Sequence, residues 1–339
     1  MNIEFWNNRM RVAAGGVALA LAIMPAGPVL AKEQPALKVQ DKGALKGATQ
    51  VAVLAFNVGF IFESVDATAA TGGLLGAFGG TTKAKSALVG VTPEMMQQIA
   101  DAAYADFTAR LNASGLAVAD PAATFADPAL AKAKGANTPA EINIALEKGS
   151  KGKASYYKPS ALPVQLMLPG DFVGSGMSSM GMNISAGQNA FQLGNYAKAA
   201  GIPVVDVTYL IDFSDQKRPG AFSFSGLKVN ANLCVTPTYS RTTVIGANGK
   251  TNTLTINQAV AVEGDFIEMN DASSGFDKTS QAAANVAGGV AAAMGLGGLG
   301  FGKTRKFEFI AKPGNYEEGA AKAASLANER IVAALAAGR

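Results

Sequence analysis

Two short apolar runs rich in β-branched residues limit most strongly what this chain can fold into. Residues 50–56 and 202–211 are typical of strands buried on both faces, which occur where helices cover both sides of a sheet. Between them, Thr92, Pro93 and Glu94 supply the capping hydroxyl, first-turn proline and first-turn carboxylate of a helix start. Apolar residues then recur at helical spacing at Met96, Ile99, Ala103, Phe107 and Leu111. The order predicts an α/β fold.

The remaining periodic segments extend this pattern. Residues 116–118 and 164–168 read as strands, 190–200 as a helix, 279–294 as an Ala-rich helix and 306–310 as a last strand. Residues 222–262 alternate, with an Asn-Gly hairpin turn at 247–250. A closing helix starts at Asn315 with a capping-box arrangement, and its inner face is Ala320, Ala324, Ala327, Ile331 and Leu335. We expect a mixed sheet covered by helices, an α/β (α+β) fold with an antiparallel hairpin extension.

The domain organisation follows from composition. Residues 1–31 read as a signal peptide, 32–48 as an extended lead-in and 49–339 as one α/β domain. Glycine-rich or polar stretches predict flexible insertions near 66–90, 134–162, 170–187 and 295–303. Within the second of these, residues 148–158 read as a basic loop, solvated or facing an anionic lipid surface.

The first residues indicate export. Arg9 and Arg11 precede an apolar stretch from Val12 to Ile23, and the segment ends in Val29-Leu30-Ala31, so we expect cleavage after Ala31. The apolar stretch is shorter than the ~20 residues that span a bilayer, which disfavours a retained anchor. No cysteine follows the cut for lipid attachment. The expected location is the periplasm, in association with the outer membrane.

Histidine is absent from the chain, and this argues against most catalysis. Ser-His-Asp triads, Cys-His pairs and HExxH zinc sites are excluded. The one cysteine, Cys234, lacks a disulfide partner and reads as a small buried residue. A net charge of +4 is too mild to predict nucleic-acid binding. We therefore expect a non-enzymatic protein with no cofactor and no nucleic-acid partner.

Three local motifs match functional patterns, but each can also be explained as ordinary loop sequence. Residues 297–304 satisfy the GxxxxGK[ST] phosphate-loop pattern, and an overlapping GxGxxG lies at 295–300, but an expected helix precedes and a strand follows, the reverse of the required order. Met177, Met180 and Met182 offer thioethers to Cu(I), or are simply methionines of an apolar loop. Ser150 to Lys153 matches SxxK without a buried helix start.

Two uncharged segments are the preferred functional surface. Residues 71–80 and 286–301 combine apolar residues with alanine and glycine, so they read as a membrane- or partner-contacting surface, or as flexible loops. The expected contact residues are Leu74, Leu75, Phe78, Val286, Val290, Met294, Leu296, Leu299 and Phe301.

The element order resembles the core of CsgG-type curli secretion proteins and of TolB N-terminal domains. The segments that carry the resemblance are the strand 51–56, the helix 92–111, the strand 115–118, and residues 197–201 leading into 204–211. Two features differ from the secretion proteins, because Lys32 stands where they carry a lipidated cysteine and Lys228 lies on the outer face of the candidate hairpin. The resemblance implies the fold, and a secretion pore is one function that it leaves open.

These observations lead to two hypotheses. The first is a non-enzymatic exported envelope protein, a scaffold or assembly factor at the periplasmic face of the outer membrane, which forms a homo-oligomer and contacts the membrane or other envelope proteins. The alternative is a periplasmic carrier whose apolar cleft, lined from the Leu74 and Met177 loops, binds a hydrophobic or lipid-like ligand.

Overall fold

A computed structural model describes most of the chain after residue 34. The described ranges are 35–69, 81–145, 150–172, 174, 178–217, 228–273 and 303–339. The expected signal peptide and its cleavage after Ala31 therefore lie outside the described residues.

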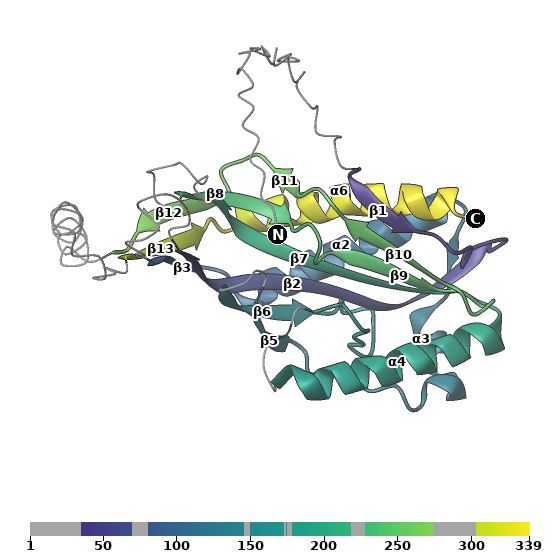
Figure 1. The fold of residues 1–339 in the computed structure, drawn as a ribbon. Coiled ribbons are helices and arrows are strands. Elements are labelled where there is room, and N and C mark those ends of the chain that lie inside the picture. Colours follow the sequence, from purple (N-terminus) through teal and green to yellow (C-terminus); the bar gives the residue numbers. More distant parts are fainter. Residues whose placement is uncertain are drawn as a thin grey trace, which may run out of the picture. The chain divides into compact units, whose positions relative to one another are not determined.

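One sheet connects all the strands of this part of the chain. The main strand order is β1-β10-β9-β7-β2-β3-β13-β12, with β4, β5, β6, β8 and β11 attached beside it (Figure 1). The strands are β1 Leu37–Gln40, β2 Gln50–Ala69, β3 Thr81–Val89, β4 Ala117–Val118, β5 Ala140–Ile144, β6 Lys151–Tyr157, β7 Val204–Lys217, β8 Lys228–Val235, β9 Arg241–Ile245, β10 Thr251–Ile256, β11 Val260–Val262, β12 Ile267–Asp271 and β13 Lys303–Ala311.

The sheet is mixed, as the sequence predicts. β2 runs parallel to β7, and β3 runs parallel to β13, whereas β2–β3, β7–β8 and β12–β13 are antiparallel pairs. Beyond Phe60, β2 leaves β7 and pairs with β3, while β7 pairs with β8 beyond Leu210. Phe213 and Phe309 then meet with ring centroids 4.9 Å apart, so the ends of β7 and β13 pack against each other.

Helices cover both faces of the sheet, which confirms the α/β class. α2 (Pro93–Ala113) and α6 (Asn315–Ala337) lie on one face; α3 (Pro121–Phe125), α4 (Ser178–Ala200) and the short helix η1 (Pro128–Leu130) lie on the other (Figure 1). The sheet separates two cores, because alternate residues of β7 point to opposite sides. The first core contains Val205 and the buried residues of α2 and α6, and the second contains Val204 and buried residues of α4. The helix stripes expected at Ile99 and Ile331 are buried.

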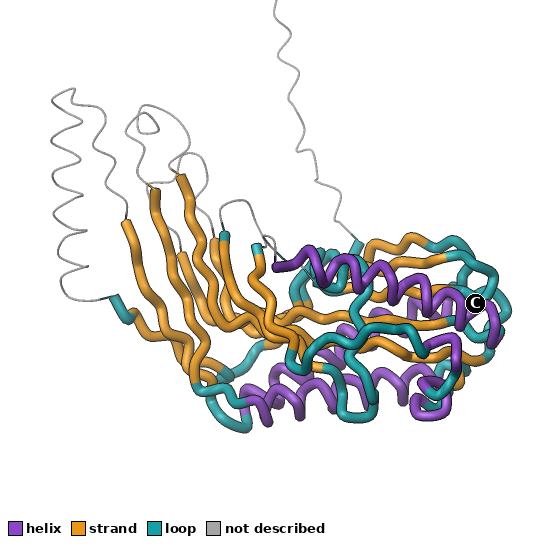
Figure 2. The backbone as a smooth tube through the Cα atoms, turned by 90° about the horizontal axis from the view of Figure 1, so that it is seen from below, coloured by secondary structure: helices purple, strands orange, loops and turns teal. Residues whose placement is uncertain are grey.

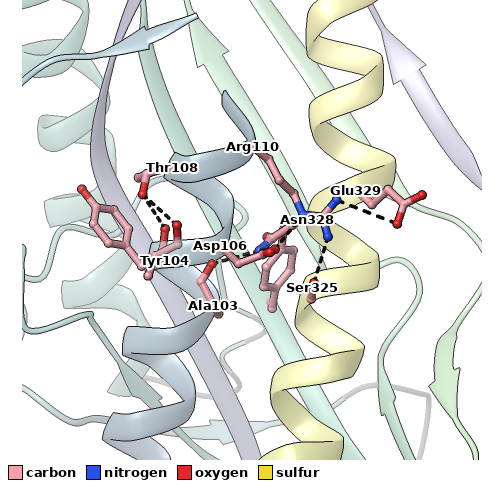
Figure 3. Close-up of polar contacts among 10 residues, drawn as sticks. Ala103, Tyr104, Asp106, Thr108, Arg110, Ser325, Asn328 and Glu329 are labelled. Atoms are coloured by element: carbon pink, nitrogen blue, oxygen red, sulfur yellow. Dashed lines mark hydrogen bonds and ion pairs between the residues drawn. The ribbon is translucent and has the colours of Figure 1, made fainter. Parts of the chain in front are cut away.

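Polar side chains join α2 to α6 across the first core (Figure 3). The buried amide of Asn328 donates to the carbonyl of Ala103 at 2.9 Å and to Oδ2 of Asp106 at 2.8 Å. Its Oδ1 accepts a 2.6 Å hydrogen bond from the hydroxyl of Tyr209 on β7. Arg110 pairs with Asp106 at 2.9 Å and donates to Ser325 at 3.1 Å. Asn328 therefore ties two helices and a strand together.

Several sequence expectations require correction. The basic loop expected at 148–158 contains the strand β6, and α4 begins at Ser178, inside the connection expected at 170–187. Residues 164–168 form only an isolated bridge, between Gln165 and Ala136, and residues 37–40 of the lead-in are an edge strand. Lysine alternates with small residues in β6, so the alternation that marks a strand carries little hydrophobicity there.

The alternating region 222–262 is not one hairpin. Its described part forms four strands, β8, β9, β10 and β11. β8 and β9 pair with different stretches of β7. The Asn-Gly turn is confirmed, because Gly249 has φ +76° between β9 and β10. The strand expected at 306–310 is confirmed as part of β13, and the helix expected at 279–294 lies outside the described residues.

Candidate functional site

Three pairs of antiparallel strands have their connecting segments at the same end of the sheet. The pairs β2–β3, β7–β8 and β12–β13 are each joined by a segment outside the described residues, namely 70–80, 218–227 and 274–302. β2 and β7 run in the same direction, and β13 begins beside the start of β3, where Lys303 pairs with Thr82. Figure 2 shows these strand ends together. The three connecting segments therefore leave the fold at one end.

The nine contact residues expected from the sequence all lie in two of these segments. Leu74, Leu75 and Phe78 belong to 70–80, and Val286, Val290, Met294, Leu296, Leu299 and Phe301 belong to 274–302, so all nine lie outside the described residues. The structure does show which strands the two segments are attached to. Thr81 and Lys303, the first residues after the two segments, begin neighbouring parallel strands. Two segments far apart in the sequence thus enter the sheet side by side.

Exposed lysines cluster on one face of the neighbouring strands β13, β3, β2 and β6. The cross-strand partners Lys306, Lys85, Val65 and Lys151 form one row through β13, β3, β2 and β6. Paired residues share a face of the sheet, and neighbouring strands lie about 5 Å apart. We name Lys83, Lys85, Lys151, Lys153 and Lys306 the lysine face; all five are exposed.

Carboxylates share this face, because strand pairing also places Glu141 of β5 and Glu268 of β12 on it. Glu63 lies 3.4 Å from Lys153, and Glu308 is the next outward-facing carboxylate on β13. The opposite face of the same strands is buried through Ala84, Ser86 and Phe307. Sequence reasoning had singled out only the part of this cluster on β6, because Lys83 and Lys306 are brought beside it only by strand pairing.

A second polar cluster lies inside the fold, between the sheet and the segment that precedes α4. Neighbouring positions on β2, β7 and β9 place Asn57 beside Thr208 and Arg241, with Asp206 beside Thr243. These residues form a buried polar layer. Asp171, which lies in the segment that precedes α4, joins this layer, and its Oδ2 accepts a 2.5 Å hydrogen bond from the amide of Leu168. Asp171 and Asp206 are completely buried. Sequence reasoning predicted no such pair of carboxylates.

Burial raises the pKa of both carboxyl groups. Desolvation raises the pKa of Asp171 to about 6, against the hydrogen bond from Leu168 and the charge of Arg241. The pKa of Asp206 lies well above its ordinary value, first because of burial and then because of the charge and hydrogen bond of Asp171. Neither oxygen of Asp206 has a donor in regular hydrogen-bond geometry. A proton held between the two carboxyl groups satisfies both observations.

Arg241 lies beside the same buried carboxyl groups. Its Nη2 donates to the hydroxyl of Thr243 at 2.9 Å, and its charge lowers the pKa of both carboxyl groups. Gly170 has φ +93°, and a Cβ at this position would lie 1.9 Å from Nη1 of Arg241. Glycine at this turn therefore gives the guanidinium room beside the segment that carries Asp171.

We expect the stability of the protein to fall as the pH rises from about 4 to 7. The unfolded carboxyl group titrates near 3.9 and the folded Asp171 near 6, so the folded state binds more protons in this window. The stabilisation is complete below the unfolded pKa and is lost as the pH passes the folded pKa, about 3 kcal/mol for Asp171 at roughly 1.4 kcal/mol per pH unit. Urea unfolding at pH 4, 6 and 8 measures it.

The variant Asp206→Asn tests the origin of this pH dependence. Asparagine cannot ionise, so Asp171 faces Arg241 without a second carboxyl group, and the variant should be more stable than the wild type at pH 8 with a flatter profile. Glu268→Gln, at an exposed position on β12, is the control and should follow the wild type. An unchanged slope in Asp206→Asn contradicts the assignment.

A cavity of about 680 Å³ opens beside this layer. It lies between the start of α4 and residues 134–141, and Met167, Met182 and Ala186 contribute apolar walls. Lys134, Glu141 and Asn189 contribute polar ones, with Asn189 Nδ2 donating to the carbonyls of Lys134 and Met167. The cavity has the size and mixed lining of a small-ligand site.

The other sequence motifs do not form sites in the described part of the chain. Lys303 and Thr304 of the phosphate-loop pattern begin a strand, whereas the motif needs a helix at this point. Lys153 of the SxxK pattern lies in β6 on the lysine face. Met180 is exposed, whereas Met182 lines the cavity; residues two apart on a helix do not face each other, and Met177 lies outside the described residues. The expectation that Cys234 is buried is confirmed.

No family model, curated protein or solved structure matches this chain. Among the described residues, no helix combines the length and apolar character needed to cross a membrane.

Proposed function

We propose that this chain is a non-enzymatic, exported protein of the cell envelope, a scaffold or assembly factor that contacts the periplasmic face of the outer membrane and forms a homo-oligomer. One observation carries the proposal. The two uncharged segments with the nine expected contact residues leave neighbouring strands at one end of a rigid sheet. Attachment to neighbouring strands starts both segments from one place on the sheet, and apolar sequence at such a place supports a membrane or partner contact.

Two further features support the proposal. The strand β2, helix α2, short strand β4, helix α4, strand β7 and closing helix α6 follow the order of the CsgG- and TolB-type domains that the sequence resembles. In addition, α4 exposes Met180, Ile184 and Phe191, each at least 60% accessible, on one side of the helix. This stripe is a candidate contact between copies.

Fractionation and sizing test the proposal together. The protein should be recovered from the envelope of its host, without residues 1–31, and should behave as a large particle by light scattering in mild detergent. Phe191→Glu should reduce the particle size, and Gln98→Glu, which adds the same charge at an exposed site on α2, should not. A monomer recovered from the cytoplasm would contradict the proposal.

The cavity beside α4 favours a second candidate function, a carrier of a hydrophobic or lipid-like ligand. Its volume of about 680 Å³ and the walls at Met167 and Met182 carry this alternative. An extract of envelope lipids should then raise the melting temperature by mass action. Gly181→Phe should remove the shift, because Gly181 lines the cavity and a Cβ at this position has no atom within 4 Å, which leaves room for the ring to occupy the ligand's space. An equal shift in Gly181→Phe would contradict the carrier hypothesis.

A further inference from the structure

The carboxyl pair of Asp171 and Asp206 joins a fixed element of the fold to a weakly held one. Asp206 lies in β7, a central strand, where it is paired with Ala55 of β2 on one side and with Thr243 of β9 on the other. Asp171 lies in residues 166–172, which contain no helix or strand and which we name the covering segment. A force that separates the two carboxyl groups therefore moves the covering segment rather than the strand.

The other polar contacts of the covering segment lie at its beginning. Asn57 of β2 donates to the carbonyl of Leu166 at 2.9 Å, and Asn189 of α4 donates to the carbonyl of Met167 at 3.2 Å. Towards the other end, Leu168 and Phe172 are buried, and the side chain of Asp171 is the polar attachment between them. Movement of this end therefore exposes apolar surface that the closed form covers.

The charges around the carboxyl pair balance only while the pair holds a proton. Arg241 of β9 is the cation that lowers the pKa of both carboxyl groups. Burial, and then the charge of Asp171, raises the pKa of Tyr156 on β6, so this hydroxyl stays neutral. Residues 178–197 of α4, the helix on this face, include no charged residue. Loss of the proton therefore leaves two buried carboxylates beside one arginine, which is unfavourable.

We infer that the covering segment opens from the sheet when the carboxyl pair loses its shared proton, and closes when the pair binds a proton again. The proton passes to water, Asp171 moves out as a hydrated carboxylate, and Asp206 stays beside Arg241. Opening exposes Leu168 and Phe172, so the pH controls how much apolar surface the protein presents on this face. This device requires neither export nor assembly, and it goes beyond the proposed function.

The direction and size of the effect follow from proton binding. In the closed form the pKa of Asp171 is raised to about 6, whereas in the open form the carboxyl group is hydrated and titrates near 3.9. The closed form thus binds more protons, so opening becomes more favourable as the pH rises from about 4 to 6 and changes little above that. These two values predict an increase of about tenfold in the opening equilibrium between pH 5 and pH 7.

Amide hydrogen exchange of the purified wild type, read by mass spectrometry, tests the inference. Each exchange rate at pH 5 and pH 7 is divided by the intrinsic rate of an unstructured peptide at the same pH. Protection of the covering segment should fall about tenfold between the two pH values. At pH 7 it should be far lower than the protection of residues 204–211 in β7, and insensitive to urea well below the unfolding transition, because a local opening exposes little surface.

Two variants and a control connect the exchange to the carboxyl pair. Asp206→Asn and Asp171→Asn each remove one ionisable group, so protection of the covering segment should no longer change between pH 5 and pH 7, and either variant suffices if the other does not fold. Glu263→Gln removes the same charge at an exposed position and should retain the tenfold change.

Three results overturn the inference. The first is equal protection of the covering segment at pH 5 and pH 7 in the wild type. The second is a covering segment that exchanges as slowly as β7 and responds to urea in the same way, because its amides then exchange only through unfolding of the whole protein. The third is a tenfold change that persists in both Asp206→Asn and Asp171→Asn.

Discussion

Replacing Arg241 with methionine is expected to lower the free energy of unfolding by about 3 kcal/mol at pH 8 and by much less at pH 4. Arg241 is the cation whose charge lowers the pKa of both Asp171 and Asp206 in the buried layer. Without it, both folded pKa values rise further above the unfolded value near 3.9. The folded state then binds more protons between the two values, so stability falls as the pH increases. Urea unfolding at the two pH values measures the difference.

Two variants separate charge from packing at this position. Arg241→Lys retains the charge, so it should lose less stability than Arg241→Met and keep a profile close to that of the wild type. Arg330→Met removes an arginine of α6 whose Nη1 donates to the carbonyl of Gln258, and should have a small effect at both pH values. An equal loss at pH 4 and pH 8 in Arg241→Met would mean that packing, rather than charge, explains the change.

Replacing Asn328 with leucine is expected to cost about 2–4 kcal/mol at any pH between 5 and 8. The substitution removes the acceptor of the Tyr209 hydroxyl and the donor to the carbonyl of Ala103, both in the first core. Each buried polar group left without a partner costs about 1–3 kcal/mol, and leucine also lacks the shape of the amide. Thermal and urea unfolding measure the loss.

The double variant Asn328→Leu with Tyr209→Phe identifies the source of the cost. Phenylalanine has no hydroxyl group, so it should recover part of the stability lost in Asn328→Leu. Ser325→Ala, on the same helix, removes only the half-exposed contact with Arg110 and should cost less than about 1 kcal/mol. If the double variant is no more stable than Asn328→Leu, the lost contact with Tyr209 is not the main contribution.

The sequence predicts the elements whose apolar residues have a clear period. The stripe of α2 and the inner face of α6 are buried as expected. The apolar run at 50–56 lies in β2, and the run at 202–211 lies in β7 from Val204 onward. β3 is missed although it alternates, because its inner positions include Ala84 and Ser86, which are too small and polar to mark a buried face. The first part of α4 is missed because its glycines and methionines are typical of a loop.

The buried carboxyl pair could be predicted only in part. Asp171, Asp206 and Arg241 are well separated in sequence, and only the pairing of β7 with β9 and the covering segment bring them together. One signal was present, since Asp206 lies in the run 202–211, where Thr208 is the other polar residue, and a charge at such a position needs a partner or a proton. The lysine face depends in the same way on strand neighbours that no local pattern identifies.

The parallel pairing of β3 with β13 has a consequence for how the molecule is made. β3 lies early in the chain and β13 near its end, so the edge of the β2–β3 hairpin stays open until almost the whole polypeptide is present. Contacts between such distant segments form slowly, and an open edge invites pairing with other chains. A newly synthesised chain therefore passes through a long period in which it is not yet folded and is prone to aggregate, and a chaperone that holds it in that state would serve it better than rapid local folding.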